Sequence, residues 1–279
     1  MSRYYSGMLA LIVCAGLFLS GCSGASKVNS AFTDSEIKVD GNQGDWQGSL
    51  QTVEGDNVAY GFKNDGKNLY FCLVTADASK MMKMLANGMT VWFTPGNSGD
   101  KIGVKFPQKM TIEDMRNMRA QNQDGQGPRD QEQRIQSMIS MQKELAVVNK
   151  DERPLYSSEI NLSKDFQAAL NYSMGQFVYE LRVPLAAGSS SQTALKAGPG
   201  DDVKVNIETG KFERPAGGSY ANRNSGDASE GQGNEGSRPR RGGGQRQGGR
   251  GNRGGGEGGG RMMGDTTPLN YSFDVQLGK

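Results

Sequence analysis

The sequence predicts a mainly β fold, an antiparallel β-sandwich with helical excursions and one long disordered loop insertion. Short runs of β-branched and aromatic residues recur along the chain and are separated by turn signals such as Asn64-Asp-Gly. In residues 177–183 apolar side chains alternate with Glu180 and Arg182, the pattern of a half-buried antiparallel strand. Strands are therefore expected at residues 36–40, 50–54, 57–63, 68–75, 89–94, 101–106, 145–149, 159–162, 169–173, 177–183, 203–207 and 267–277.

Two regions have a helical period instead of the alternation of strands. Residues 77–86 begin with Asp77, whose carboxylate can cap a helix N-terminus. A helical insertion is expected over about residues 111–144, in two pieces, 111–120 and 130–144, that are polar on one side and carry methionine on the other. We expect this insertion to pack over or beside a sheet.

Residues 214–265 differ abruptly in composition from the rest of the chain. They hold 19 of the 41 glycines and no lysine, so they cannot bury a core and are predicted to be a disordered Gly/Arg-rich insertion. The last run, 267–277, alternates again, which indicates an insertion in a loop and not a tail. The β-sandwich domain is therefore expected to comprise residues 36–213 together with 266–279.

The N-terminus has the layout of a secretory signal peptide, because a basic residue precedes a short apolar stretch. The ending Leu19-Ser20-Gly21-Cys22 resembles the bacterial lipobox, which implies cleavage before Cys22 and lipidation of its sulfur. Residues 1–21 are then the lipoprotein signal peptide and 22–35 a polar tether to the domain. The resemblance implies a lipid-anchored protein of the bacterial cell envelope, and Ser23, in place of an Asp retention signal, favours the outer membrane. An ordinary signal peptide with an incidental Cys22 is the alternative.

Composition excludes several classes of chemistry. The chain has no histidine, which removes the Ser-His-Asp triad, the Cys-His dyad and histidine-based zinc sites. Its 32 Lys and Arg nearly balance 30 Asp and Glu, so no nucleic-acid partner is expected. Cys72 lies in an apolar run and is interpreted as a buried hydrophobic residue. No catalytic residue, metal site or cofactor is predicted.

Four segments carry a resemblance to a known group of domains. Residues 37–46 combine an apolar strand, an Asp-Gly turn and Trp46, and they are followed by 65–71, 89–93 and 179–185. Their order resembles carbohydrate-binding module family 9 and the related DOMON group. The resemblance implies an antiparallel β-sandwich whose ligand varies among sugar, haem and none.

Carbohydrate binding would need aromatic side chains with exposed faces and flanking polar groups. The candidate ligand-binding residues are Trp92, Tyr70 and Trp46, and packing in the core is the alternative for each of them. Trp92 lies between Thr90 and Thr94 on one face of its expected strand. A solvent-facing Trp92 in a cleft favours a sugar ligand, whereas a buried one favours a scaffold.

The sequence therefore predicts a non-catalytic, lipid-anchored envelope protein that binds a ligand, with carbohydrate favoured. One alternative is an envelope scaffolding or assembly lipoprotein without a small ligand. Another is a haem- or copper-binding electron-transfer module that uses the abundant methionines, although methionine equally suits irregular core packing. The expected partners are the membrane, carbohydrate or another envelope protein, and an anionic envelope polymer for the Arg-rich insertion.

Overall fold

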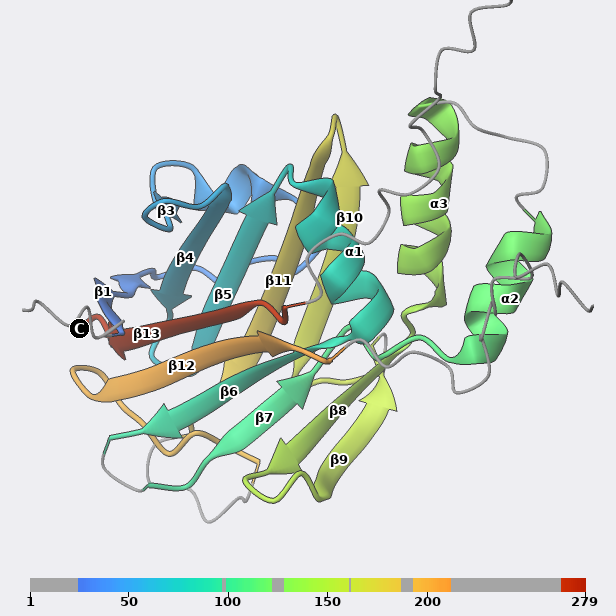
Figure 1. The fold of residues 1–279 in the computed structure, drawn as a ribbon. Helices are drawn as coiled ribbons and strands as arrows, with labels where there is room; N and C mark the ends of the chain where they lie inside the picture. Colours follow the sequence, from blue (N-terminus) through green and yellow to red (C-terminus); the bar gives the residue numbers. More distant parts are fainter. Residues whose placement is uncertain (1–24, 97–98, 122–127, 161, 187–192, 212–266) are drawn as a thin grey trace, which may run out of the picture.

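The computed structural model describes residues 25–96, 99–121, 128–160, 162–186, 193–211 and 267–279. Within them the chain forms two β-sheets that pack face to face, so the prediction of a mainly β sandwich with helical excursions is confirmed (Figure 1). Sheet A contains, in spatial order, β1 (Ser26–Asn29), β13 (Asn270–Gln276), β12 (Asp202–Thr209), β6 (Met89–Pro95), β7 (Ile102–Lys105), β8 (Glu144–Asn149) and β9 (Pro154–Glu159). Sheet B contains β10 (Gln167–Ser173), β11 (Gln176–Pro184), β5 (Asn68–Thr75), β4 (Val58–Asn64) and β2 (Ala31–Phe32), and β3 (Gln51–Thr52) also pairs with β4.

The sheets are mixed and not purely antiparallel. Most neighbouring strands are antiparallel, but β1 runs parallel to β13 and β2 runs parallel to β4. Neither of these pairs is a hairpin, so no local turn imposes an antiparallel direction on them. Their direction follows from where the N-terminal part of the chain enters the sandwich.

Part of the segment expected to be a tether, residues 22–35, is built into the sandwich. Residues 26–32 form β1 and β2, which join the edges of sheet A and sheet B in succession. Ser30, between the two strands, donates through Oγ to Asn64 Oδ1 at 2.5 Å, and Gly278 N donates to the same oxygen at 3.0 Å. This small polar segment is held by backbone pairing and by a buried asparagine, which is why its weak apolar pattern did not predict a strand.

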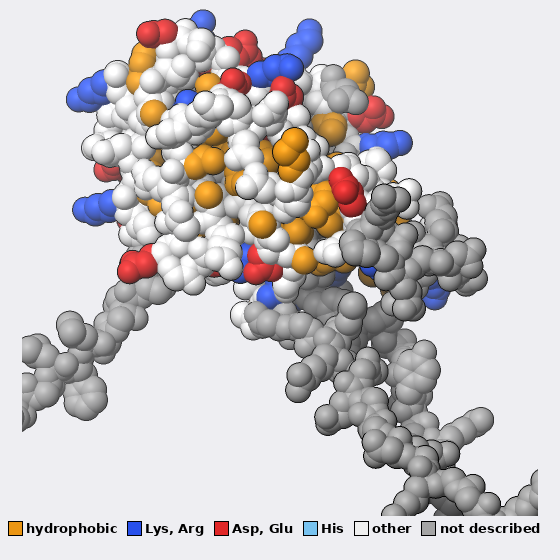
Figure 2. Space-filling model, turned by 90° about the horizontal axis from the view of Figure 1, so that it is seen from above, with side chains coloured by type: hydrophobic (Ala, Val, Ile, Leu, Met, Phe, Trp, Pro, Cys, Tyr) orange, Lys and Arg blue, Asp and Glu red, His pale blue; other side chains and the backbone are white. Residues whose placement is uncertain are grey.

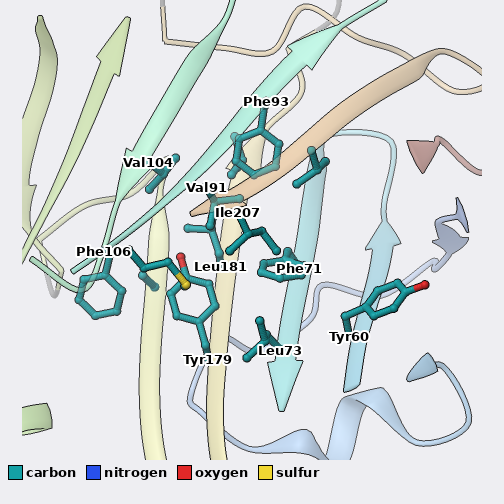
Figure 3. Close-up of a cluster of buried hydrophobic side chains, with 14 of the residues drawn as sticks. Tyr60, Phe71, Leu73, Val91, Phe93, Val104, Phe106, Tyr179, Leu181 and Ile207 are labelled. Atoms are coloured by element: carbon teal, nitrogen blue, oxygen red, sulfur yellow. The ribbon is translucent and has the colours of Figure 1, made fainter. Parts of the chain in front are cut away.

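The hydrophobic core lies between the two sheets (Figure 3). Tyr60 of β4 and Phe273 of β13 approach to 4.3 Å between ring centroids across this interface. Val91 and Phe93 of β6 point into the core, as the predicted alternation requires. The final strand lies beside β12, with Val205 registered opposite Phe273, so the last alternating run belongs to the sandwich as expected.

A smaller apolar cluster lies on the outer side of sheet B. Residues 36–50, hereafter the covering segment, are expected to begin with a strand but contain only a 3-10 helix, Gln43–Trp46, and no ladder partner before β3. Ile37 and Trp46 of this segment pack on Tyr70, Cys72 and other side chains of the sheet. Glu180 and Arg182 do lie on the outer side of β11, but the covering segment buries them instead of leaving them to solvent.

Other expected strand bounds shift by a few residues. The strand expected at 159–162 is displaced, because β9 ends at Glu159 and the chain then turns toward β10. The Asn64-Asp-Gly turn joins β4 and β5 as an antiparallel pair, which confirms that hairpin. Gly66 adopts a φ of +79° there, a conformation that favours glycine.

Three helices accompany the sheets. They are α1 (Ala78–Asn87), α2 (Ile112–Gln121) and α3 (Pro128–Met141), and the last two occupy the predicted helical insertion. Asp77 caps α1 by accepting from Ser79 N at 2.8 Å and Lys80 N at 3.1 Å. Seen from the end of the sandwich where α1 and α3 lie, hydrophobic side chains are visible among charged ones (Figure 2).

The signal peptide, Cys22 and the Gly/Arg-rich insertion at 214–265 lie outside the described residues. None of the helices in the described part of the chain is both long enough and apolar enough to cross a membrane.

Candidate functional site

Trp92 lies on the outer face of sheet A and is held by three neighbours. Its Nε1 donates to Glu208 Oε1 of β12 at 2.6 Å. Its six-membered ring lies above Gly103 of β7, where an added Cβ would come within 2.7 Å of Cε3 and Cζ3. The Nζ of Lys101 lies over the indole, 4.0 Å from the ring centroid, a cation–π distance. These contacts leave only 4 % of Trp92 exposed.

Polar side chains surround Trp92 because neighbouring strands place registered residues on the same face. Asn206 of β12 is registered opposite Trp92, and its Oδ1 accepts from Ser272 Oγ of β13 at 2.8 Å. A pocket of about 650 Å³ lies at the β1 end of this face. Its lining residues include Lys27, Thr94, Lys204 and Asp274. The outer face of sheet A thus offers hydrogen-bond donors and acceptors on both sides of one indole.

Trp46 has the same three kinds of neighbour on the outer side of sheet B. Its Nε1 donates to Glu180 Oε1 at 2.6 Å, a Cβ added at Gly61 would lie 3.1 Å from its Cε3, and Lys63 Nζ lies 5.7 Å from the ring centroid. The other Glu180 oxygen accepts from Asp40 N at 2.9 Å and from Gly41 N at 2.5 Å. Glu180 therefore fastens the covering segment to β11, and Trp46 is only 1 % exposed.

Burial and hydrogen bonding act in opposite directions on Glu180. Removal from water raises the pKa of the Glu180 carboxyl, while the N–H donors of Trp46, Gly41 and Asp40 lower it, and the net direction is upward. The ionised Glu180 carboxylate is thus hydrogen-bonded in a site where its removal from water is unfavourable. This environment fits a structural latch, because the donors come from the protein itself and occupy both oxygens.

Tyr70 belongs to the same cluster as Trp46 and is fully buried. Its hydroxyl donates to Asp65 Oδ2 at 2.7 Å, and burial raises the pKa of Tyr70. Cys72 lies beside it in the cluster, is buried, and has its pKa raised by desolvation. The interpretation of Cys72 as a buried hydrophobic residue is therefore confirmed.

The structure brings two of the three candidate binding residues together and separates the third. Trp46 and Tyr70 share the cluster under the covering segment, whereas Trp92 lies on the opposite sheet. All three are buried, so none presents a free ring face to a ligand in this conformation. Their role in ligand binding stays a prediction.

Sequence reasoning missed a second charged group, Arg182. Its guanidinium donates through one terminal nitrogen to Glu36 Oε1 and through the other to the carbonyl of Lys164. A pocket of about 520 Å³ lies beside these contacts, between residues 36–39 and a wall that includes Ser163 and Gln167. The sequence did contain a sign that these charges are covered. Glu180 and Arg182 are charged residues in an otherwise apolar strand, and the covering segment, earlier in the chain, carries apolar residues that can pack over them.

The methionines of the described helices mostly serve packing. Met81, Met84, Met110 and Met138 are buried in the central cluster, which favours the core interpretation over a copper or haem site. In the part of the chain that the structure describes, no three or more Asp, Glu or Cys side chains gather as a metal site would require.

The fold and its outer faces define a two-sheet β-sandwich with one Trp–Glu–Lys group on each sheet. No protein-family model matches the chain, and no curated protein matches it. Among solved structures, a family 9 carbohydrate-binding module from Caldicellulosiruptor kristjanssonii in complex with glucose aligns at TM-score 0.30 and 9% identity, covering 66% of this chain and 78% of that one. The same module in complex with cellotriose aligns at TM-score 0.30 and 8% identity, with coverages of 66% and 76%.

A third structure is a protein from Bacteroides uniformis to which carbohydrate binding has been attributed. It aligns at TM-score 0.35 and 8% identity, over 67% of this chain and 84% of that chain. At these scores and identities the similarities support no conclusion about the ligand of this chain.

Proposed function

We propose that the protein is a non-catalytic, lipid-anchored protein of the bacterial cell envelope that binds carbohydrate on the outer face of sheet A. The observation that carries the proposal is the position of Trp92, an indole whose neighbours on the β12 and β13 side of the sheet face are polar. Aromatic rings stack on the apolar faces of sugars, and flanking polar groups bind their hydroxyls. Asn206, Glu208 and Ser272 supply such groups in the immediate neighbourhood.

The Lys101 ammonium lies over the indole, so a sugar ring must displace it before stacking. An exposed cation–π contact is worth about 0.5–1 kcal/mol, and its loss would weaken binding about two- to fivefold. That cost is small beside the stacking and hydrogen bonds gained. Movement of the Lys101 side chain is therefore the first change that the proposal requires, because Trp92 is only 4 % exposed with Lys101 in place.

Cys22 and the described domain are close in sequence. Only residues 23–25 separate the cysteine from β1, which begins at Ser26. Four Cα-to-Cα steps span at most about 14 Å, so an acylated Cys22 would hold the sandwich beside the membrane surface. Replacing Cys22 by Ser is expected to move the protein from the membrane fraction to the soluble fraction, and unchanged fractionation would contradict the anchor.

A glycan array probed with the mature chain carrying Cys22→Ser tests the ligand. We expect binding that Trp92→Ala weakens at least tenfold and that Lys101→Ala preserves or strengthens. Lys63→Ala is the matched control, because Lys63 lies over Trp46 on the covered sheet. Absence of binding across the array, or binding that Trp92→Ala leaves unchanged, would overturn the proposal.

A scaffolding function has one observation in its favour. The near-complete burial of Trp92 repeats the arrangement of Trp46, which fastens a segment of the chain to its sheet. If Trp92 likewise only stiffens sheet A, the face would dock another envelope protein. Cross-linking in intact cells separates the two functions: a specific protein adduct at Lys204→Cys together with a silent glycan array favours the scaffold.

A further inference from the structure

The pocket beside Arg182 lies on the other sheet from Trp92. One wall consists of residues 36–39 of the covering segment, and the opposite wall includes Ile160, Ser163 and Gln167. Its volume of about 520 Å³ lies within the range of small-molecule sites and is large enough to admit a single sugar ring. The pocket is polar on both walls, with Glu36 and Lys38 on one side and Ser163 and Gln167 on the other.

Arg182 ties the two walls together. On β11 it is registered between Gln167 of β10 and Tyr70 of β5, so it adjoins the lining residue Gln167 and reaches the pocket through its contact with Glu36. One terminal nitrogen donates to Glu36 and the other to the carbonyl of Lys164. The Nε is buried and has no hydrogen-bond partner among the described residues, so the donors of the guanidinium are not all used.

The two partners in this ion pair differ in burial. The Arg182 side chain is 9% exposed, whereas that of Glu36 is 67% exposed. A buried guanidinium needs an anionic partner, since an uncompensated buried charge is strongly destabilising. Glu36 supplies the anion from an exposed position at the pocket, where another carboxylate could take its place.

We propose that this pocket binds a small carboxylate-bearing sugar, a hexuronate, whose carboxylate displaces Glu36 from Arg182. Arginine presents a planar fork that matches a carboxylate. Lys38, paired at 2.8 Å with Asp40, adds a second positive charge to the wall next to Glu36. Displacement of Glu36 would leave Arg182 without an anionic partner, because the charge of Lys38 is already paired with Asp40, and a ligand carboxylate would restore that partner.

The remaining pocket residues suit the ring of a uronate. The Ser163 Oγ accepts from Phe166 N at 3.3 Å and keeps its own proton for donation to a ligand oxygen. The Gln167 amide offers a donor and an acceptor for hydroxyl groups. Ile160, which is partly exposed at the pocket, provides apolar surface for the C–H face of the ring. The site is independent of the carbohydrate surface proposed on sheet A.

Isothermal titration of the mature chain carrying Cys22→Ser tests the proposal with three probes: D-glucuronate, D-glucose and acetate. We expect saturable binding of glucuronate with a Kd at least tenfold below that of either other probe. Glucose lacks the carboxylate and acetate lacks the ring, so equal binding of glucose or of acetate would overturn the assignment.

Glu36→Gln removes the competing carboxylate and leaves Arg182 a neutral amide partner, so its folding is checked by circular dichroism; it is expected to tighten glucuronate binding about two- to fivefold. Arg182→Lys keeps the charge but loses the fork, and it is expected to weaken binding at least tenfold. Circular dichroism checks that Arg182→Lys is folded, and Gln167→Ala probes the pocket without altering Arg182. No tightening in Glu36→Gln would overturn the displacement of Glu36 by a ligand.

Trp92→Ala separates this site from the surface proposed on sheet A. It should leave glucuronate binding unchanged, because Trp92 lies on the other sheet. Loss of glucuronate binding in Trp92→Ala would assign the uronate to sheet A and overturn the pocket.

Discussion

Gly103→Ala is expected to force Trp92 out of its place on sheet A. The added methyl group would lie 2.7 Å from Cε3 and Cζ3 of the indole and 3.1 Å from Thr90 Cγ2. Carbon atoms pack at about 3.5–4.0 Å, so the ring must move by about 1 Å. The 2.6 Å hydrogen bond from Trp92 to Glu208 would then lengthen or break.

The expected cost is about 1–3 kcal/mol in the free energy of unfolding, the usual range for an overpacked site. Urea unfolding measures it. Because the chain has only two tryptophans, a red shift of the fluorescence emission, with stronger acrylamide quenching, reports the movement of the indole. Gly103→Ala should therefore lower stability and expose Trp92 together.

Gly44→Ala is the matched control. Its added methyl group would meet nothing nearer than Asn42 Oδ1 at 3.4 Å, and its expected effect on stability is within about 0.5 kcal/mol. If Gly103→Ala unfolds at the urea concentration of the wild type with unshifted emission, the indole does not depend on Gly103, and the account of this face is refuted.

Three further predictions concern buried groups. Asn64→Ala should cost about 2–4 kcal/mol in urea unfolding, because it unfastens β4 from Gly278 near the C-terminus; a cost below 1 kcal/mol would contradict this role. Burial raises the pKa of Glu180 above its ordinary 4.5, so the folded state holds the proton to higher pH than the unfolded state. Wild type should therefore lose stability relative to Glu180→Gln as pH rises from about 4.5 toward neutral, and a constant difference across that range would refute the upward shift. Met84→Ala should cost about 2–5 kcal/mol, since Met84 is fully packed in the core, and a haem absorption band in the wild type that this substitution abolishes would contradict the packing role.

Much of the sandwich could be predicted from the sequence. The strand expected at 68–75 is β5, and 89–94 and 177–183 lie within β6 and β11. These strands are central, and their apolar alternation records the burial of one face on the core. The cap of α1 by Asp77 followed equally from local chemistry.

The N-terminal strands and the covering segment could not be predicted in the same way. β1 and β2 are short and show no apolar alternation, and they depend on β13 and β4, which are distant in sequence. The covering segment has the apolar residues of a strand, but Ile37 buries its side chain on a sheet face without pairing its backbone. Alternation of apolar and polar residues indicates which side chains are buried. It does not reveal whether the backbone pairs with a neighbouring strand.

The candidate site likewise has features that the sequence predicts and features that it does not. Its aromatic residues could be chosen from the sequence, and the alternation of β6 correctly placed Trp92 on the side opposite Val91 and Phe93. Whether each ring is free or covered depends on Gly103, Lys101 and Glu180, which lie elsewhere in the chain. The pairing of Arg182 with Glu36 joins residues 146 positions apart, and no local pattern predicts it.

The sequence by itself determined the class of fold, the central strands, the capped helix and the absence of histidine chemistry, because each depends on residue type or on short-range periodicity. The tertiary structure alone decided which outer faces are covered, where the two pockets lie and which charges are buried. Those properties arise where distant segments meet and exclude water, and the order of residues along one strand does not contain them.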